Sequence, residues 1–301
     1  MQDRLKTAFE IGAHPISLVS RKTRPGAECI VEELVLATAG GEHFRGLMTR
    51  PGDDGRHPAI LYIHAHGNRY DIGASELLDG RPALVSPPGP LLANAGYAAL
   101  CIDLPGFGSR AAATESALAK ARLWRGGTLA GQMLGELHAA LGFLAAEPGI
   151  DAARIGAFGI SMGATFAYWL AAVEPRLAAA VHLCCYADFD VLVETGAHDL
   201  HGIYLTVPGL LEIASNGEIA GLVAPRPQFI GIGDRDPLTP PAAVDRALAA
   251  TRKAYAKAGA ADRLALHREA GLGHSESAAM RAAWLAFLDL HLKPSMAGAS
   301  A

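Results

Sequence analysis

Short apolar runs alternate with helical stretches along most of this chain of 301 residues, and this alternation restricts the possible folds more than any other feature. Six runs follow one another, at residues 59–64, 97–104, 154–160, 177–185, 227–233 and 263–270. Strands that are apolar throughout and separated by helices are typical of a mostly parallel sheet with helices on both faces. The sequence therefore predicts an α/β fold.

The helices between these runs are visible in the spacing of their apolar residues. From Leu129 to Leu144, leucine and methionine recur at helical intervals. Similar patterns cover about 241–258 and 276–292. Ser275 lies just before the last pattern, so we predict that it caps this helix at its N-terminus.

Two segments depart from the alternation. Residues 27–50 contain two strand-like runs on either side of a Gly-Gly pair, which predicts a hairpin within an N-terminal extension of about residues 1–50. Residues 186–224 are longer than an ordinary connection, which predicts a small helical insertion that supplies walls for a substrate pocket.

The chain shows no internal repeat and no low-complexity linker, so we expect residues 1–301 to form a single domain.

Charge and composition narrow the classes of partner. The formal net charge is −4 and no cluster of lysine or arginine stands out, which argues against a nucleic-acid or anionic-membrane partner. The sequence also lacks a signal-peptide pattern and a run of roughly 18 apolar residues, so we expect a cytoplasmic protein. Its cysteines have no metal-ligand spacing and are expected to be reduced and buried; they are Cys29, Cys101, Cys184 and Cys185.

A glycine-rich turn follows the third apolar run. Residues 159–163 read GISMG, a G-x-S-x-G pattern between a predicted strand and a predicted helix. A sharp turn of this kind lifts a serine hydroxyl out of the sheet, and it needs small residues two positions away because the backbones pack closely there. The pattern alone is weak in a chain with 34 glycines, but its place between strand and helix is specific. Ser161 is therefore the predicted nucleophile, and the alternative is a surface serine in an ordinary turn.

A serine nucleophile needs a base, and the base needs an acid that orients it. In this type of turn the chain order is serine, acid, histidine, with the last two on loops after later strands. Asp236 follows the run at 227–233, and His274 precedes the last predicted helix, so we predict these two as acid and base. Asp234 is the rival acid, and we expect it to cap the turn or to pair with Arg235.

With these motifs the chain resembles the α/β-hydrolase superfamily over about residues 25–292. The closer likeness is to serine esterases of the dienelactone-hydrolase and acetyl-xylan-esterase-like group. It rests on DLPGFGSR (103–110), GISMGATFAYWLAA (159–172), LVAPRPQFIGIGDRDPLTP (222–240) and GLGH (271–274). The resemblance implies the α/β-hydrolase fold and the roles given above for Ser161, Asp236 and His274. Dienelactone hydrolases themselves carry a cysteine nucleophile, so the serine favours the esterase branch.

The loop after the first apolar run reads HAHG at residues 64–67 and is similar to the H-G-x-G of many relatives, with alanine where glycine is usual. In this fold, one backbone N–H of this loop and one from the residue after the nucleophile stabilise the oxyanion. We assign these two roles to His66 and Met162. Gly67 and Asn68 are the alternatives for the loop donor.

The two histidines of this loop also suggest a metal site. An H-x-H pair places both rings on one side of an extended backbone, as in metallo-β-lactamase-like hydrolases, which continue as H-x-H-x-D-H. Here His64 and His66 are followed by Gly67, Asn68 and Arg69, so the further ligands are missing. We expect no metal and no other cofactor.

These patterns together predict a serine hydrolase that cleaves a small-molecule carboxylic ester through an acyl-enzyme. Because fold and catalytic residues do not fix the acyl partner, a thioesterase or a peptidase stays an alternative. The other alternative is a protein that has this fold and binds a ligand but catalyses no reaction. His198 and His201 lie in the predicted insertion and either line the pocket or face solvent. The acyl group, the alcohol group and the oligomeric state are left open.

Overall fold

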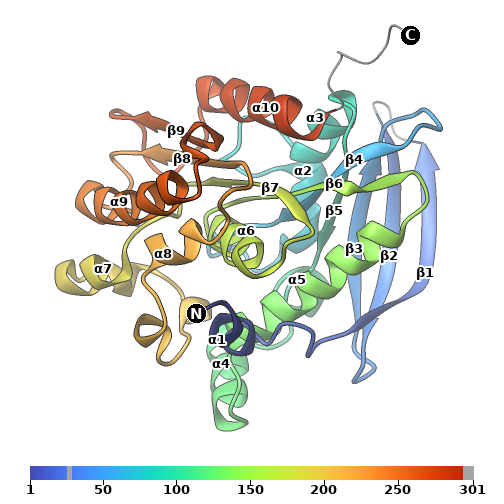
Figure 1. Cartoon of the computed structure of the whole chain (residues 1–301). Coiled ribbons are helices and arrows are strands. Elements are labelled where there is room, and N and C mark those ends of the chain that lie inside the picture. The colour runs from blue at the N-terminus through green and yellow to red at the C-terminus, as the bar shows by residue number, and fades with distance from the viewer. Residues whose placement is uncertain (26–28, 294–301) are drawn as a thin grey trace, which may run out of the picture.

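The computed structural model describes residues 1–25 and 29–293, and its centre is one nine-stranded sheet in the order β1-β2-β3-β5-β4-β6-β7-β8-β9 (Figure 1). The strands from β4 to β9 are parallel to one another, whereas β1, β2 and β3 join the edge next to β5 as antiparallel strands. Their bounds are β1 (Ile16–Pro25), β2 (Ile30–Thr38), β3 (His43–Arg50), β4 (His57–Ile63), β5 (Ala98–Ile102), β6 (Ile150–Ile160), β7 (Leu177–Leu183), β8 (Gln228–Gly233) and β9 (Leu264–Glu269).

All six apolar runs are strands of the parallel part, so the predicted α/β class is confirmed. The central strands β4, β5 and β7 are buried on both faces, which explains why their sequences are apolar without alternation. The strand ends that carry the site all lie at one edge, because parallel strands end together at their carboxyl termini.

Helices cover both faces of the sheet (Figure 1). One face packs against α1 (Gln2–Ala8), α5 (Leu129–Ala146), α6 (Met162–Val173), α8 (Asn216–Gly221) and α9 (Pro241–Lys257). The other face packs against α2 (Glu76–Asp79), α3 (Pro88–Asn94) and α10 (Ala278–Leu292). The predicted helices at 129–144 and 241–258 are confirmed as α5 and α9. Among the residues described, no helix is both long and apolar enough to cross a membrane.

The prediction that Ser275 caps the last helix is wrong. Helix α10 begins at Ala278, and Ser277 is its N-cap, with its Oγ accepting the Met280 N–H at 2.9 Å. The chain turns before this point, because the Ser275 N–H donates to the Gly273 carbonyl. Both serines satisfy the residue preference of a cap, and only the path of the loop decides between them.

The N-terminal region contains more structure than a hairpin. Strands β2 and β3 pair around a turn at Gly40 and Gly41, as predicted, although residues 27 and 28 of the predicted hairpin lie outside the described residues. Strand β1 extends this hairpin to three strands, and α1 precedes it. The ring of Phe9, just after α1, stacks on Trp169 of α6 at 4.9 Å, so this segment packs against the helix that follows Ser161.

The predicted insertion at residues 186–224 is helical. It contains α7 (Phe189–Thr195), three short 3-10 helices and α8. Asp188 caps α7, since its side chain accepts the Val191 N–H, and Ser215 and Glu218 form a capping box on α8. The segment thus returns to the sheet through α8, which packs against α9.

Candidate active site

Ser161 occupies the turn between β6 and α6. Its φ of 60° and ψ of −124° lie in a region that non-glycine residues rarely adopt. The turn is held in place because the Ser161 N–H donates to the Leu183 carbonyl of β7 at 2.8 Å. The turn thereby brings the hydroxyl to the carboxyl edge of the sheet, and the residue is 7% exposed.

The two glycines that flank Ser161 permit this turn. A Cβ on Gly159 would lie 2.3 Å from the backbone of Gly163, and a Cβ on Gly163 would lie 1.9 Å from the carbonyl oxygen of Ile63 at the end of β4. No real side chain tolerates such contacts, so both positions require glycine. The close approach also places the start of α6 against the loop that follows β4.

The structure brings the three predicted catalytic residues together in one hydrogen-bonded chain. The His274 Nε2 lies 2.9 Å from the Ser161 Oγ, and the His274 Nδ1 lies 2.6 Å from Asp236 Oδ2. Asp236 is buried, and its second oxygen accepts the Leu238 N–H at 2.9 Å. A carboxylate fixed on both oxygens holds the Nδ1 proton, which leaves Nε2 free to accept the serine proton.

Asp234 lies apart from this chain. Its carboxylate pairs with Arg268 of β9 at 2.5 Å, so the expected pairing with Arg235 is wrong. The Arg235 N–H donates to the Leu272 carbonyl, which helps to fix the loop that carries Asp236. Asp234 directly follows β8, and Arg268 lies on the adjacent strand β9, so the pair joins residues that are far apart in the sequence.

The loop at residues 64–67 lies beside Ser161, against the first turn of α6. The Ala65 N–H donates to the carboxylate of Glu76 at 3.1 Å, and the Asn68 N–H donates to His66 Nδ1 at 3.1 Å. Within residues 1–25 and 29–293, the N–H groups of His66, Gly67 and Met162 have no acceptor. Of the three candidates for the loop donor, Asn68 is thus already bound, and His66 and Gly67 are free.

A buried ion pair supports this loop from behind. Glu76 is fully buried in α2 and pairs with Arg81, whose Nη2 donates to the Ala65 carbonyl at 3.0 Å. The Tyr62 hydroxyl donates to the same carboxylate at 2.5 Å. Burial raises the pKa of Glu76, although Arg81 opposes this change. Both backbone groups of Ala65 are therefore fixed by charged partners.

The rings of the two loop histidines have separate partners. His64 is buried; its Nε2 accepts the Leu104 N–H at 3.2 Å, and burial lowers its pKa to about 4. His66 Nε2 donates to Glu115 at 2.7 Å. In the described part of the chain, no three histidine, cysteine or carboxylate side chains are grouped so that they could hold a metal. Their contacts indicate that both rings support the loop.

The insertion encloses a pocket of about 520 Å³, which we call the insertion pocket. Its charged lining residues are Asp199 and Glu212, both acidic. His198 and His201 also line it, and His201 Nε2 donates to the Leu238 carbonyl of the Asp236 loop at 3.0 Å. Burial lowers the pKa of His201, which also lies near enough to feel the charges of Asp236 and His274. The apolar lining includes Phe189, Leu192, Ile203, Leu205, Val207 and Leu210.

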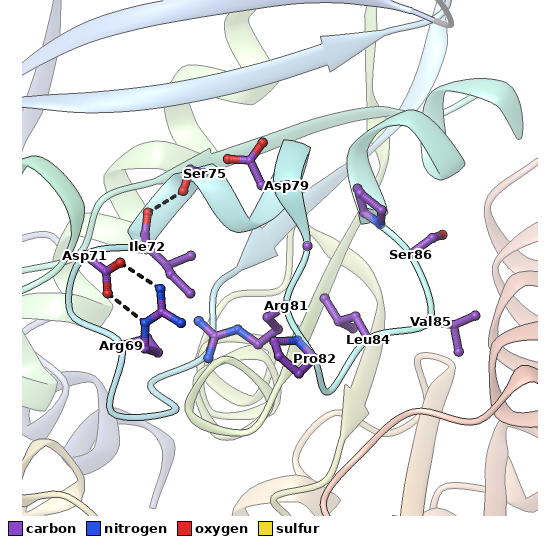
Figure 2. A pocket seen from close by; sticks show the side chains of 12 residues that line it. Arg69, Asp71, Ile72, Ser75, Asp79, Arg81, Pro82, Leu84, Val85 and Ser86 are labelled. Atoms are coloured by element: carbon purple, nitrogen blue, oxygen red, sulfur yellow. Dashed lines mark hydrogen bonds and ion pairs between the residues drawn. The ribbon is translucent and has the colours of Figure 1, made fainter.

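A second pocket, of about 580 Å³, lies between the loop after β4 and the segment around α2 and α3 (Figure 2). Figure 2 shows Arg69 paired with Asp71 on one side, and the side chain of Arg81 extending toward them. This pocket is polar, in contrast to the insertion pocket. It adjoins the site through Arg81, the residue that also holds the Ala65 carbonyl.

Sequence reasoning missed three charged residues that support the site. Glu76, Arg81 and Glu115 contact the 64–67 loop, yet none belongs to a motif or a periodic pattern. Glu115 follows the N-cap Thr114 and is the first residue of α4 (Glu115–Trp124), where an acidic residue is ordinary. No local sequence pattern therefore indicates these three residues, because their contacts depend on the tertiary fold.

Comparison with known proteins places the chain in a family of hydrolases. A family model described as the dienelactone hydrolase family matches residues 89–281. The protein YtaP of Bacillus subtilis (strain 168), a hydrolase by name, is 37% identical over 276 residues, which cover 91% of this chain and 92% of YtaP.

Solved structures of esterases share the fold. An acetyl xylan esterase from Paenibacillus sp. R4 superposes with a TM-score of 0.67 at 18% identity, over 97% of this chain and 93% of that one. A glucuronoyl esterase from Solibacter usitatus superposes with a TM-score of 0.67 at 13% identity, over 97% of this chain and 92% of that one.

Proposed function

Because the chain belongs to the dienelactone hydrolase family, we propose that it is a serine hydrolase that cleaves a carboxylic ester through an acyl-enzyme. The observation that carries this proposal is the continuous contact from Ser161 through His274 to Asp236. Each group lies within the distance at which a base accepts the proton of a nucleophile.

The proposed reaction has two steps. The Ser161 oxygen attacks the ester carbonyl while His274 Nε2 takes its proton, and the same proton then passes to the leaving alcohol as the acyl-enzyme forms. Water, deprotonated by His274, releases the acid and restores the serine. Asp236 holds the imidazole in one tautomer.

The oxyanion of each step would be stabilised by backbone N–H groups. We assign the Met162 N–H, at the start of α6, and the His66 N–H, with Gly67 as the alternative to His66. All three N–H groups lack an acceptor within the described residues. The helix N-terminus adds a favourable field at Met162.

We propose that the insertion pocket receives an uncharged, apolar group of the substrate. Its apolar lining favours an alkyl or aromatic group, whereas Asp199 and Glu212 would repel an anion. The proteins of similar structure are named for acetyl and glucuronoyl esters, and a screen of acyl chain length with chromogenic esters tests whether this chain prefers an acyl group as short as acetyl. We expect the rate to rise beyond acetate. Thioester and peptide substrates belong in the same screen.

The test of the proposed mechanism is the alanine variant of Ser161. A fluorophosphonate should label the wild-type protein once, and Ser161→Ala should abolish both labelling and ester hydrolysis. Undiminished hydrolysis by the folded variant would remove the serine mechanism. If the wild-type protein is neither labelled nor active on any ester or thioester, the result would instead favour a binding protein without catalytic activity.

The predictions of metal independence and of a cytoplasmic location stay predictions. For the first, we propose that treatment with a chelator leaves the hydrolysis rate unchanged. The four cysteines are buried, as predicted.

A further inference from the structure

The carboxylate of Glu115 connects three segments around the site. Its Oε2 accepts hydrogen bonds from His66 Nε2 at 2.7 Å and from the Tyr70 hydroxyl at 2.9 Å. Its Oε1 accepts the Tyr204 N–H at 2.8 Å. His66 and Tyr70 belong to the loop after β4, Tyr204 belongs to the insertion, and Glu115 itself begins α4. One buried side chain thus ties the loop to the insertion.

The His66 ring is fixed on both of its nitrogens. Because Nδ1 accepts the Asn68 N–H, the ring proton is on Nε2 and is donated to Glu115. The ring also stacks on Tyr204, with centroids 5.0 Å apart and an interplanar angle of 25°. A ring held in this way restricts rotation of the His66 backbone, and so restricts the direction of its N–H.

Electrostatics keep Glu115 ionised. Burial alone would raise its pKa, but the hydrogen bonds from His66, the Tyr204 N–H and Tyr70 outweigh burial, and the pKa lies below its ordinary value. Its position at the first turn of α4 also favours negative charge. At neutral pH the carboxylate can therefore accept all three hydrogen bonds at once.

We propose that Glu115 is a positioning residue, which holds His66 in the orientation where its N–H stabilises the oxyanion and ties this donor to the wall of the insertion pocket. Tyr204 lies between Ile203 and Leu205, which both line that pocket. The wall of the insertion pocket and the loop donor are thereby held by the same side chain. The inference rests on the proposed function and on His66 as the loop donor.

The test compares Glu115→Ala and Glu115→Gln with the wild type. Removing an oxyanion donor outright costs about 10²–10³ in kcat, so a donor that is only misplaced should cost less. We expect kcat of Glu115→Ala to fall about tenfold to a hundredfold, and KM for a short ester to change by less than about threefold. Glu115→Gln keeps one acceptor oxygen, so its kcat should lie between that of the wild type and that of Glu115→Ala.

Glu32 provides the matched control. It is a glutamate of similar burial that pairs with Arg21 and Arg50, and it lies on β2, four strands from β6. Glu32→Ala should lose stability, measured by urea unfolding, and keep the wild-type kcat. A fluorophosphonate gives a second readout: its phosphoryl oxygen occupies the same hole, so labelling of Glu115→Ala should slow by a factor similar to the loss in kcat.

Three results would overturn the inference: wild-type kcat in folded Glu115→Ala, a loss no greater than that of Glu32→Ala, or an unchanged labelling rate. If Glu115→Ala does not fold, the same criteria apply to Glu115→Gln against Glu32→Gln. Full activity in Ser161→Ala would be a different failure, because it would remove the serine mechanism itself. The two failures are therefore distinguishable.

Discussion

Asp236 and Asp234 are two residues apart and differ in nearly every property that matters for an orienting acid. Asp236 is 2% exposed and contacts His274 Nδ1, whereas Asp234 is partly exposed and is neutralised by Arg268. An acid that sets the tautomer must be buried and fixed, because otherwise water competes for the imidazole proton. Burial and partner both favour Asp236.

We predict that Asp236→Asn lowers kcat by several orders of magnitude, since an amide no longer selects the tautomer that accepts the serine proton. Asp234→Asn should change kcat by less than about tenfold, or about 1.4 kcal/mol of activation free energy. Steady-state kinetics on a chromogenic ester measure both, with circular dichroism to show that the variants are folded. Exchanged phenotypes would make Asp234 the acid.

The sequence was sufficient to select the residues that meet at the site, but not their supports. Ser161, Asp236 and His274 each lie directly after or before a predictable element, so chain order and loop position identified them. Glu76 and Glu115 act through contacts between segments far apart in the sequence, and no local pattern encodes such contacts. The wrong cap assignment, Ser275 for Ser277, has the same cause: the path of a loop is a tertiary property.

The junction of β4, β6 and α6 is the element on which the site depends most closely. Gly163 allows the first turn of α6 to approach the end of β4, where the oxyanion loop begins. We predict that Gly163→Ala lowers the free energy of unfolding by about 2 kcal/mol or more, because the added methyl group meets backbone that cannot rotate away. Urea denaturation measures this change.

Gly142 is the control for this substitution. It also lies within a helix, α5, but a Cβ there would meet only Arg176 Nη1 at 3.9 Å. Gly142→Ala should raise the free energy of unfolding by about 0.5–1 kcal/mol, since alanine is the better helix former. If Gly163→Ala proved as stable as the wild type, the close approach of α6 to β4 would be in doubt.

The strands that could be predicted from the sequence are mainly those that the fold buries. The strands β4 to β8 are mostly buried and apolar, and each matches its predicted run within about two residues at either end, except that β6 starts four residues before the run. The edge strand β9 (LALHRE) is half-buried and partly polar, and its predicted run matches within one residue. Strand β1 was missed because it lies at the sheet edge and is mostly exposed, so its second half, SRKTR, is polar. The hydrophobic pattern therefore detects strands that the fold buries or half-buries, and it misses the exposed strand β1.

For the whole molecule, the order of the strands in the sheet is not predicted by the pattern of apolar runs. Alternating strands and helices predict a parallel sheet, but they do not show that β5 lies between β3 and β4. The family match and the esterase structures confirm the fold that the resemblance implied. The same fold buries ionisable side chains in its core, which links its stability to pH.

His182 of β7 is the clearest case of this linkage. It is fully buried against Tyr168 and Tyr186, and burial lowers its pKa to about 3 from an ordinary value of 6.5. Between these two values the unfolded chain binds a proton at this ring and the folded chain does not. Protonation therefore stabilises the unfolded state, and the free energy of unfolding falls as the pH drops below about 6.5.

We predict that His182→Phe flattens this dependence. Loss of one linked proton should reduce the slope of unfolding free energy against pH by up to about 1.4 kcal/mol per pH unit between pH 5 and 6, whatever the variant's stability at pH 7. His43, an exposed residue of β3, is the control, and His43→Gln should keep the wild-type slope. Urea unfolding at several pH values supplies the slopes. Equal slopes for His182→Phe and the wild type would mean that the buried ring takes up its proton without unfolding, and that water reaches the core beside β7.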